Sequence, residues 1–121
     1  MTKKNLLLTD MRVTQFQMLY NLVDSIYTEM KEFSKKKPDD LLNEFKVKQI
    51  NRVLKDLIEF LKSEPTSGFM ELLDGETLPS NSDAILVISQ FKASMDNFKN
   101  ANISKFGSWK TVENPDGINI D

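Results

Sequence analysis

Apolar residues between Asp10 and Lys36 recur at alternating steps of three and four positions, the spacing of one face of an α-helix. They are Phe16, Leu19, Val23, Ile26, Met30 and Phe33. A second run with the same spacing follows, made of Val47, Ile50, Leu54, Leu57 and Leu61. The break between the two runs, residues 34–39, is short, basic and contains a proline. The pattern therefore predicts a long antiparallel helical hairpin.

Polar residues at the ends of the two runs indicate where the helices begin and end. A side-chain oxygen of Thr9 or Asp10 can cap the first helix, and one of Asp39 or Asp40 can cap the second, by accepting from a free amide of the first turn. We expect the second helix to reach about Ser63, just before a proline.

A connector and a third long helix are expected next. Residues 67–74 predict a short helix that ends at Gly75 in the left-handed cap position. Its apolar side chains would close one end of the bundle; they are Phe69, Met70, Leu72 and Leu73.

Ser80 and Asp83 then form a capping box before a dense apolar run. Helical spacing continues to about Asn102 through Ala84, Ile88, Phe91, Met95 and Phe98. A strand over residues 85–89 is the alternative, because Ile and Val favour extended backbone, but the period of three and four favours the helix.

The last part of the chain has the chemistry of a β-hairpin. Asn114-Pro115-Asp116-Gly117 is a turn sequence between residues 109–113 and residues 118–120. Either Trp109 and Val112 dock this ribbon on the helices, or it becomes ordered only against a partner. We therefore predict an all-α fold with an arm at residues 1–9, a helical bundle at residues 10–103 and a tail or hairpin at residues 104–121.

Composition limits the chemistry of the protein. The chain has 121 residues, 40% hydrophobic and 28% charged, which fits one folded domain. It has no cysteine, which excludes disulfides and thiolate sites, and no histidine, the commonest general base and transition-metal ligand. We expect no cofactor. The net charge of −2 creates no field that would attract nucleic acid or an anionic membrane.

No apolar run is long enough to span a bilayer, and the three leucines at residues 6–8 are too few for the core of a secretory signal. The expectation is a soluble, cytoplasmic protein without membrane attachment.

The first predicted helix has an unusual polar face. Its only charged residue between Val13 and Thr28 is Asp24. A face that meets only solvent usually carries more Lys and Glu, so contact on a second side is indicated. The uncharged positions are Thr14, Gln17, Met18, Asn21, Ser25 and Thr28. Either the third long helix of the same chain covers this face, or a second subunit or a protein partner does.

One set of carboxylates favours an enzymatic alternative. Glu29 and Glu32 are three positions apart, as are Glu71 and Asp74. Pairs on facing helices can hold Mg²⁺ for phosphate hydrolysis, since this cation prefers oxygen ligands. The spacing is also common by chance in a chain with 18 acidic residues.

Two further alternatives rest on other residue types. Three consecutive lysines, Lys35, Lys36 and Lys37, lie where the first helix should end, and cations are stabilised by the free carbonyls there. The same lysines are candidates for weak nucleic-acid binding, although no aromatic side chains accompany them to stack on bases. Six Met and eight Phe could line a ligand cavity, but in most bundles such residues fill the core. The function that the sequence favours is a small, non-catalytic protein–protein interaction or assembly module, either a homo-oligomer or bound to a dedicated protein partner.

Overall fold

The computed structural model describes residues 7–119, which contain three long helices and no β-strand. The helices are α1 (Asp10–Lys36), α2 (Glu44–Phe60) and α3 (Asn81–Asn102), and a short 3₁₀ helix, η1 (Pro65–Phe69), follows α2. The predicted all-α class is therefore confirmed, and the strand considered for residues 85–89 is helical instead. Residues 1–6 of the predicted arm and Ile120 of the predicted hairpin lie outside the described residues.

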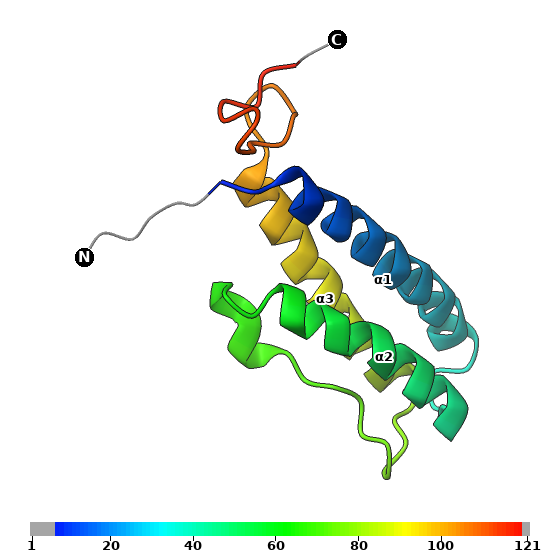
Figure 1. The fold of residues 1–121 in the computed structure, drawn as a ribbon. Coiled ribbons are helices and arrows are strands. Elements are labelled where there is room, and N and C mark those ends of the chain that lie inside the picture. Colours follow the sequence, from blue (N-terminus) through cyan, green and yellow to red (C-terminus); the bar gives the residue numbers. More distant parts are fainter. Residues whose placement is uncertain (1–6, 120–121) are drawn as a thin grey trace.

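The three long helices surround one apolar core. In Figure 1, α2 and α3 both run in the direction opposite to α1. α1 packs more extensively on α3 than on α2, although the apolar spacing had made α2 the expected main partner. Side chains from all three helices are fully or almost fully buried, among them Phe16, Val23, Leu54, Leu57, Ile88, Phe91 and Met95.

An aromatic cluster closes the bundle at the start of α1. The ring of Phe16 lies 5.6 Å from that of Phe98 on α3 and 6.2 Å from that of Phe60 on α2. Trp109 of the tail meets Phe16 edge-on at 5.1 Å. Arg12 covers the cluster, because its guanidinium lies 3.7 Å from the centre of the Phe60 ring and donates to the Phe60 carbonyl at 2.5 Å. This residue thus ties the first turn of α1 to the last turn of α2.

Two of the predicted helix caps are present. The Thr9 hydroxyl accepts from the Arg12 amide at 3.0 Å, and the Ser80 hydroxyl accepts from the Asp83 amide at 3.1 Å. The cap predicted for the second helix at Asp39 or Asp40 is wrong, since Asn43 accepts from the Lys46 amide at 2.8 Å.

The loop before α2 explains this shift. The Leu42 amide donates to the Pro79 carbonyl at 2.9 Å, and the Asn81 amide donates to the Asp40 carbonyl at 2.8 Å. Leu42 is buried. Because residues 40–42 are engaged with the chain that enters α3, the helix begins only after them.

The connector between α2 and α3 differs from the prediction. Residues 67–74 do not form an α-helix, and among the described glycines only Gly107 and Gly117 have positive φ, so Gly75 is not a left-handed cap. Since α2 and α3 run in the same direction, the chain must return along the 17 residues of α2, about 25 Å. Residues 70–80, which join η1 to α3, span that length in an extended conformation, whereas a helix of the same eleven residues would cover only about 16 Å.

Side chains of the connector pack only in part. Asn51 of α2 exchanges two hydrogen bonds of 2.9 Å with the backbone of Leu73, which is buried. Met70 packs against the core, but Phe69 is 80% exposed and Leu72 is also exposed, so the predicted apolar plug is wrong for these two residues.

The tail folds back on the bundle but forms no hairpin within the described residues. The Gly117 amide donates to the Asn114 carbonyl at 3.0 Å, and Gly117 has a φ of 62°, so the predicted turn is present. Its flanks pair elsewhere, because Thr111 pairs with Leu8 and Trp109 pairs with Ile103. Trp109 packs on the core as expected, whereas Val112 is exposed.

Candidate functional site

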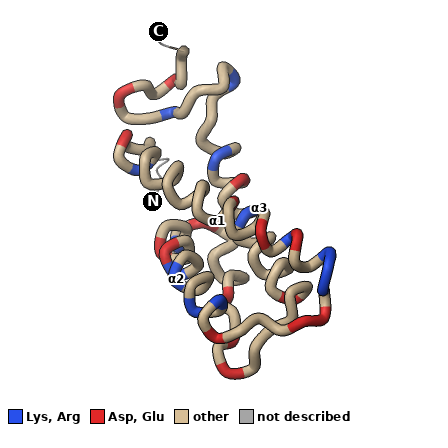
Figure 2. Tube along the Cα trace, turned by 90° about the vertical axis from the view of Figure 1, so that its right-hand side faces the viewer, with Lys and Arg blue, Asp and Glu red and all other residues tan. Residues whose placement is uncertain are grey.

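The uncharged face of α1 is open to solvent along its whole length. We define the α1 flank as Thr14, Gln17, Met18, Asn21, Ser25 and Thr28. All six residues are exposed, and Met18 retains 65% of its accessible surface. On an α-helix they share an arc of about 100°. Only Asp24 carries a charge between Val13 and Thr28, so this part of the tube in Figure 2 is almost entirely tan.

α3 covers the strip of α1 beside the flank rather than the flank itself. Lys92 of α3 donates to the Tyr20 hydroxyl at 2.8 Å and lies 3.5 Å from the Asp24 carboxylate. Its ammonium group also lies 5.5 Å from the centre of the Tyr27 ring. The hydrogen bond with Tyr20 raises the pKa of Lys92, and the nearby carboxylates of Asp96 and Asp24 act in the same direction against partial burial. The expectation that the third long helix covers the flank is therefore wrong.

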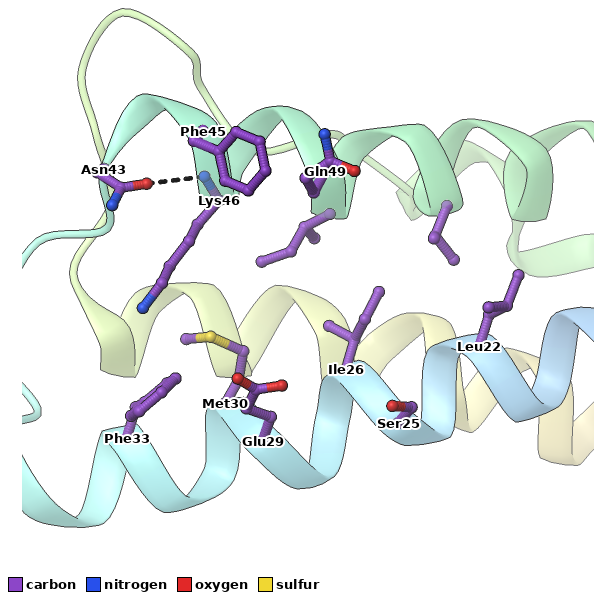
Figure 3. A pocket seen from close by; sticks show the side chains of 12 residues that line it. Leu22, Ser25, Ile26, Glu29, Met30, Phe33, Asn43, Phe45, Lys46 and Gln49 are labelled. Atoms are coloured by element: carbon purple, nitrogen blue, oxygen red, sulfur yellow. Dashed lines mark hydrogen bonds between the residues drawn. The ribbon is translucent and has the colours of Figure 1, made fainter.

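An apolar groove adjoins the flank between α1 and α2. Its volume is about 450 Å³, within the range of small-molecule sites. Figure 3 shows Leu22, Ile26 and Met30 rising from α1 toward the gap, with Phe45 and Gln49 on the opposite wall. Ser25 belongs to both surfaces, so the flank and the groove are continuous.

The polar groups of the groove are unevenly placed. Lys46 extends from α2 toward α1, and its ammonium group lies 4.4 Å from the centre of the Phe33 ring (Figure 3). Glu29 is the acidic residue on the α1 wall. Beyond one end of the groove, a second recess includes Leu22 and is lined by two cations, Arg52 and Lys55, and one carboxylate, Asp56.

The candidate metal ligands are not brought together. Within residues 7–119, no three side chains of Asp, Glu, Cys or His are grouped so that they could hold a cation. Glu29 and Glu32 are on α1, as predicted, but Glu71 and Asp74 lie on the extended connector instead of a helix.

Asp74 has a structural role in that connector. Its carboxylate accepts from the amides of Glu76 at 2.8 Å and Thr77 at 3.2 Å. These two hydrogen bonds lower the pKa of Asp74. The geometry therefore gives no support to phosphate hydrolysis at this set of carboxylates.

The three lysines lie at the carbonyl end of α1. Lys35 and Lys36 occupy its last turn and Lys37 is its C-cap. Lys35 is 3.9 Å from Glu32 in an exposed ion pair. Lys36 and Lys37 line a recess next to Asn81, whose amide donates to the Lys37 carbonyl at 2.8 Å. Among the described residues, no aromatic ring forms a cation–π pair with the ammonium group of any of these three lysines.

Sequence reasoning identified the flank but not the groove beside it. Two large apolar residues of the groove, Phe45 and Leu22, are 68% and 49% exposed. One signal in the sequence could have indicated the groove. On both α1 and α2, the apolar stripe is wider than the strip that a single partner helix can cover. Only the packing of α1 on α3 decides which side of that stripe stays open.

None of the helices in the described part of the chain is long and apolar enough to cross a membrane. Comparisons with protein families, with curated proteins and with solved structures found no match to this chain.

Proposed function

We propose that the protein is a small, non-catalytic protein–protein interaction module and that the α1 flank, together with the adjoining groove, is its docking surface. The observation that carries the proposal is the exposure of all six flank residues on a helix whose opposite side is packed in the core. An uncharged, partly apolar helix face is typical of the core of a protein interface, where charged residues are depleted.

Neighbouring side chains add to this surface. Met11, Met18 and Leu22 are exposed along the same side of α1. Methionine is flexible and polarisable, so it adapts to a partner at little cost. Self-association through this surface is the alternative to a different partner, because the flank carries no charge that would repel a second copy.

Asn21→Arg tests the proposal, with Asn97→Arg as a matched control. Both residues are exposed on long helices, and both changes add one positive charge. In a docking surface, burying the new guanidinium without a partner is costly, so Asn21→Arg should abolish partner capture or shift the species seen by light scattering. Asn97→Arg should leave both unchanged.

Circular dichroism should show the same helix content for both variants, because neither position contributes to the core. A chain that stays monomeric at high concentration and captures no protein, or an Asn21→Arg variant that behaves like Asn97→Arg, would contradict the proposal.

A further inference from the structure

The groove between α1 and α2 has the dimensions of a helix site. Its α1 wall runs from Leu22 to Phe33, which corresponds to about 16 Å, or three helical turns. The ribbon of α3 passes behind the gap in Figure 3, and the groove itself is lined by α1, α2 and Asn43 just before α2. α1, α2 and α3 occupy three positions of a bundle, and a helix placed over Ile26, Met30 and Val53 would occupy a fourth.

The edge formed by α2 carries more positive than negative charge. Three cations, Lys46, Arg52 and Lys55, and one carboxylate, Asp56, lie along the groove and its continuation. Within residues 7–119, none of the three is within ion-pair distance of a carboxylate; the pairs present there involve Lys35, Lys62 and Lys92. The α1 wall carries the opposite sign at Glu29 and is otherwise uncharged. The two edges of the groove thus differ in charge.

We propose that this groove binds an amphipathic helix of another protein, with its apolar stripe in the groove and its carboxylates on the side that faces α2. The inference rests on the proposed function and specifies the partner. Apolar anchors at positions i, i+3, i+4 and i+7 would fill the space over Ile26 and Met30, as in other helix-in-groove complexes. Acidic residues on one flank would pair with Lys46 and Arg52, whereas acidic residues on the other flank would meet Glu29.

The helices of this chain do not offer that combination. α1 exposes Met11, Met18 and Leu22, but its flank has no carboxylate. α2 and α3 each expose a single large apolar side chain, Phe45 and Leu86, and so neither presents an apolar stripe. A nucleic acid matches the basic edge but not the apolar floor or Glu29. The charge pattern therefore favours an acidic helix from a different protein over a second copy or an oligonucleotide.

Selection from a library of displayed helices tests this inference on the full chain. Each member has a fixed apolar stripe over four turns and random residues on both flanks. Selected helices should be enriched in Asp and Glu on one flank only, and their affinity should fall roughly tenfold or more when NaCl rises from 50 to 500 mM. The double variant Lys46→Glu/Arg52→Glu should instead select Lys and Arg on that flank.

Ser25→Arg, which places a bulky cation at the mouth of the groove, should abolish binding of the selected helices, and Asn97→Arg should not. Selected helices without a charge preference, no selected helix, or equal binding to Ser25→Arg would overturn the inference. A dimer of the chain that Ser25→Arg dissociates, or an oligonucleotide gel shift that requires Lys46 and Arg52, would also overturn it. Asn21→Arg tests the proposed function separately. If Asn21→Arg abolishes partner capture while the helix selection fails, the inference about the groove is wrong and the proposed function is not.

Discussion

Arg12 is a single side chain that joins two helices at the aromatic end of the bundle. It combines a hydrogen bond to the Phe60 carbonyl with stacking on the Phe60 ring. Partial burial lowers the pKa of Arg12, partly offset by Glu64, but the guanidinium stays charged at neutral pH. The last carbonyls of α2 lack helical partners, so this donor satisfies one of them.

Arg12→Ala should lower the free energy of unfolding by about 2 kcal/mol, because it removes a charge-assisted hydrogen bond and a cation–π contact. Arg12→Lys should cost less, since an ammonium group can still donate to the carbonyl but cannot stack as a plane. Denaturant unfolding measures both changes. Arg52→Ala is the control, because Arg52 is exposed and its side chain makes one hydrogen bond among the described residues, to Gln49 at 3.4 Å. A cost for Arg12→Ala no larger than that for Arg52→Ala would contradict this role.

Lys92 makes stability depend on pH at the alkaline end. Its pKa is raised in the folded state, above the ordinary value of 10.5, mainly by the hydrogen bond with Tyr20. Stabilisation from such a group is fully present below the unfolded-state pKa and is lost as pH rises through the folded-state pKa. The stability advantage of the parent chain over Lys92→Met should therefore shrink as pH rises above 10.5.

Unfolding at a series of pH values measures this difference. Lys99→Met is the matched control, because Lys99 is exposed on the same helix and makes no ion pair among the described residues. If the difference in unfolding free energy between the parent chain and Lys92→Met stays constant as pH rises above 10.5, Tyr20 does not hold Lys92 in solution.

Helix caps show how far residue-level reasoning reaches. Thr9 and Ser80 were predictable because each precedes a clear apolar period and has a side-chain acceptor. Asp39 and Asp40 have the same chemistry as the real cap, Asn43. The choice among them depends on the pairing of residues 40–42 with the chain before α3, which no local pattern encodes.

At the scale of elements, long helices with a continuous apolar period were predictable, and the segments between them were not. α1 has the predicted bounds, and α3 begins after the predicted cap, Ser80, and ends at Asn102 as expected. The connector is extended because of the distance it must cover along α2. The tail has its predicted turn, but its backbone pairs with Leu8 and Ile103, which are distant from that turn in the sequence.

Gly117 holds the tail in its folded shape, because it lies close to Ser104 and Ser108 at the start of the tail. It has a φ of 62°, and an added Cβ would lie 2.5 Å from the Ser104 Cβ and 2.8 Å from the Ser108 carbonyl oxygen. Gly117→Ala should strain this contact by about 1–3 kcal/mol and loosen the tail. Trp109, the one tryptophan, should then become more accessible, with red-shifted emission and stronger acrylamide quenching, while helical circular dichroism stays nearly unchanged.

Gly75→Ala is the control for this change. Gly75 has no positive φ, and no atom would lie within 4 Å of its added Cβ. It should leave tryptophan emission unchanged and stability equal or slightly higher. Equal emission spectra for the two variants would show that Gly117 does not hold the tail.

At the scale of the whole molecule, the packing of α1 decides which surfaces stay open. α1 contacts α3 through one side and α2 less extensively through another, which leaves the flank exposed and the groove open. The sequence identified the flank from its lack of charge. It could not identify the groove, because the apolar residues of α1 and α2 give no signal for which of them a third helix covers.

Site-specific photo-crosslinking in the native cell tests the docking role most directly. A photoreactive amino acid replaces Met18 in the flank or, as the control, Asn97 on the exposed side of α3. The account predicts one defined protein adduct from position 18, mapped by mass spectrometry to a single segment of the partner, and none from position 97. The absence of an adduct at position 18, or the same diffuse products from both positions, would contradict it.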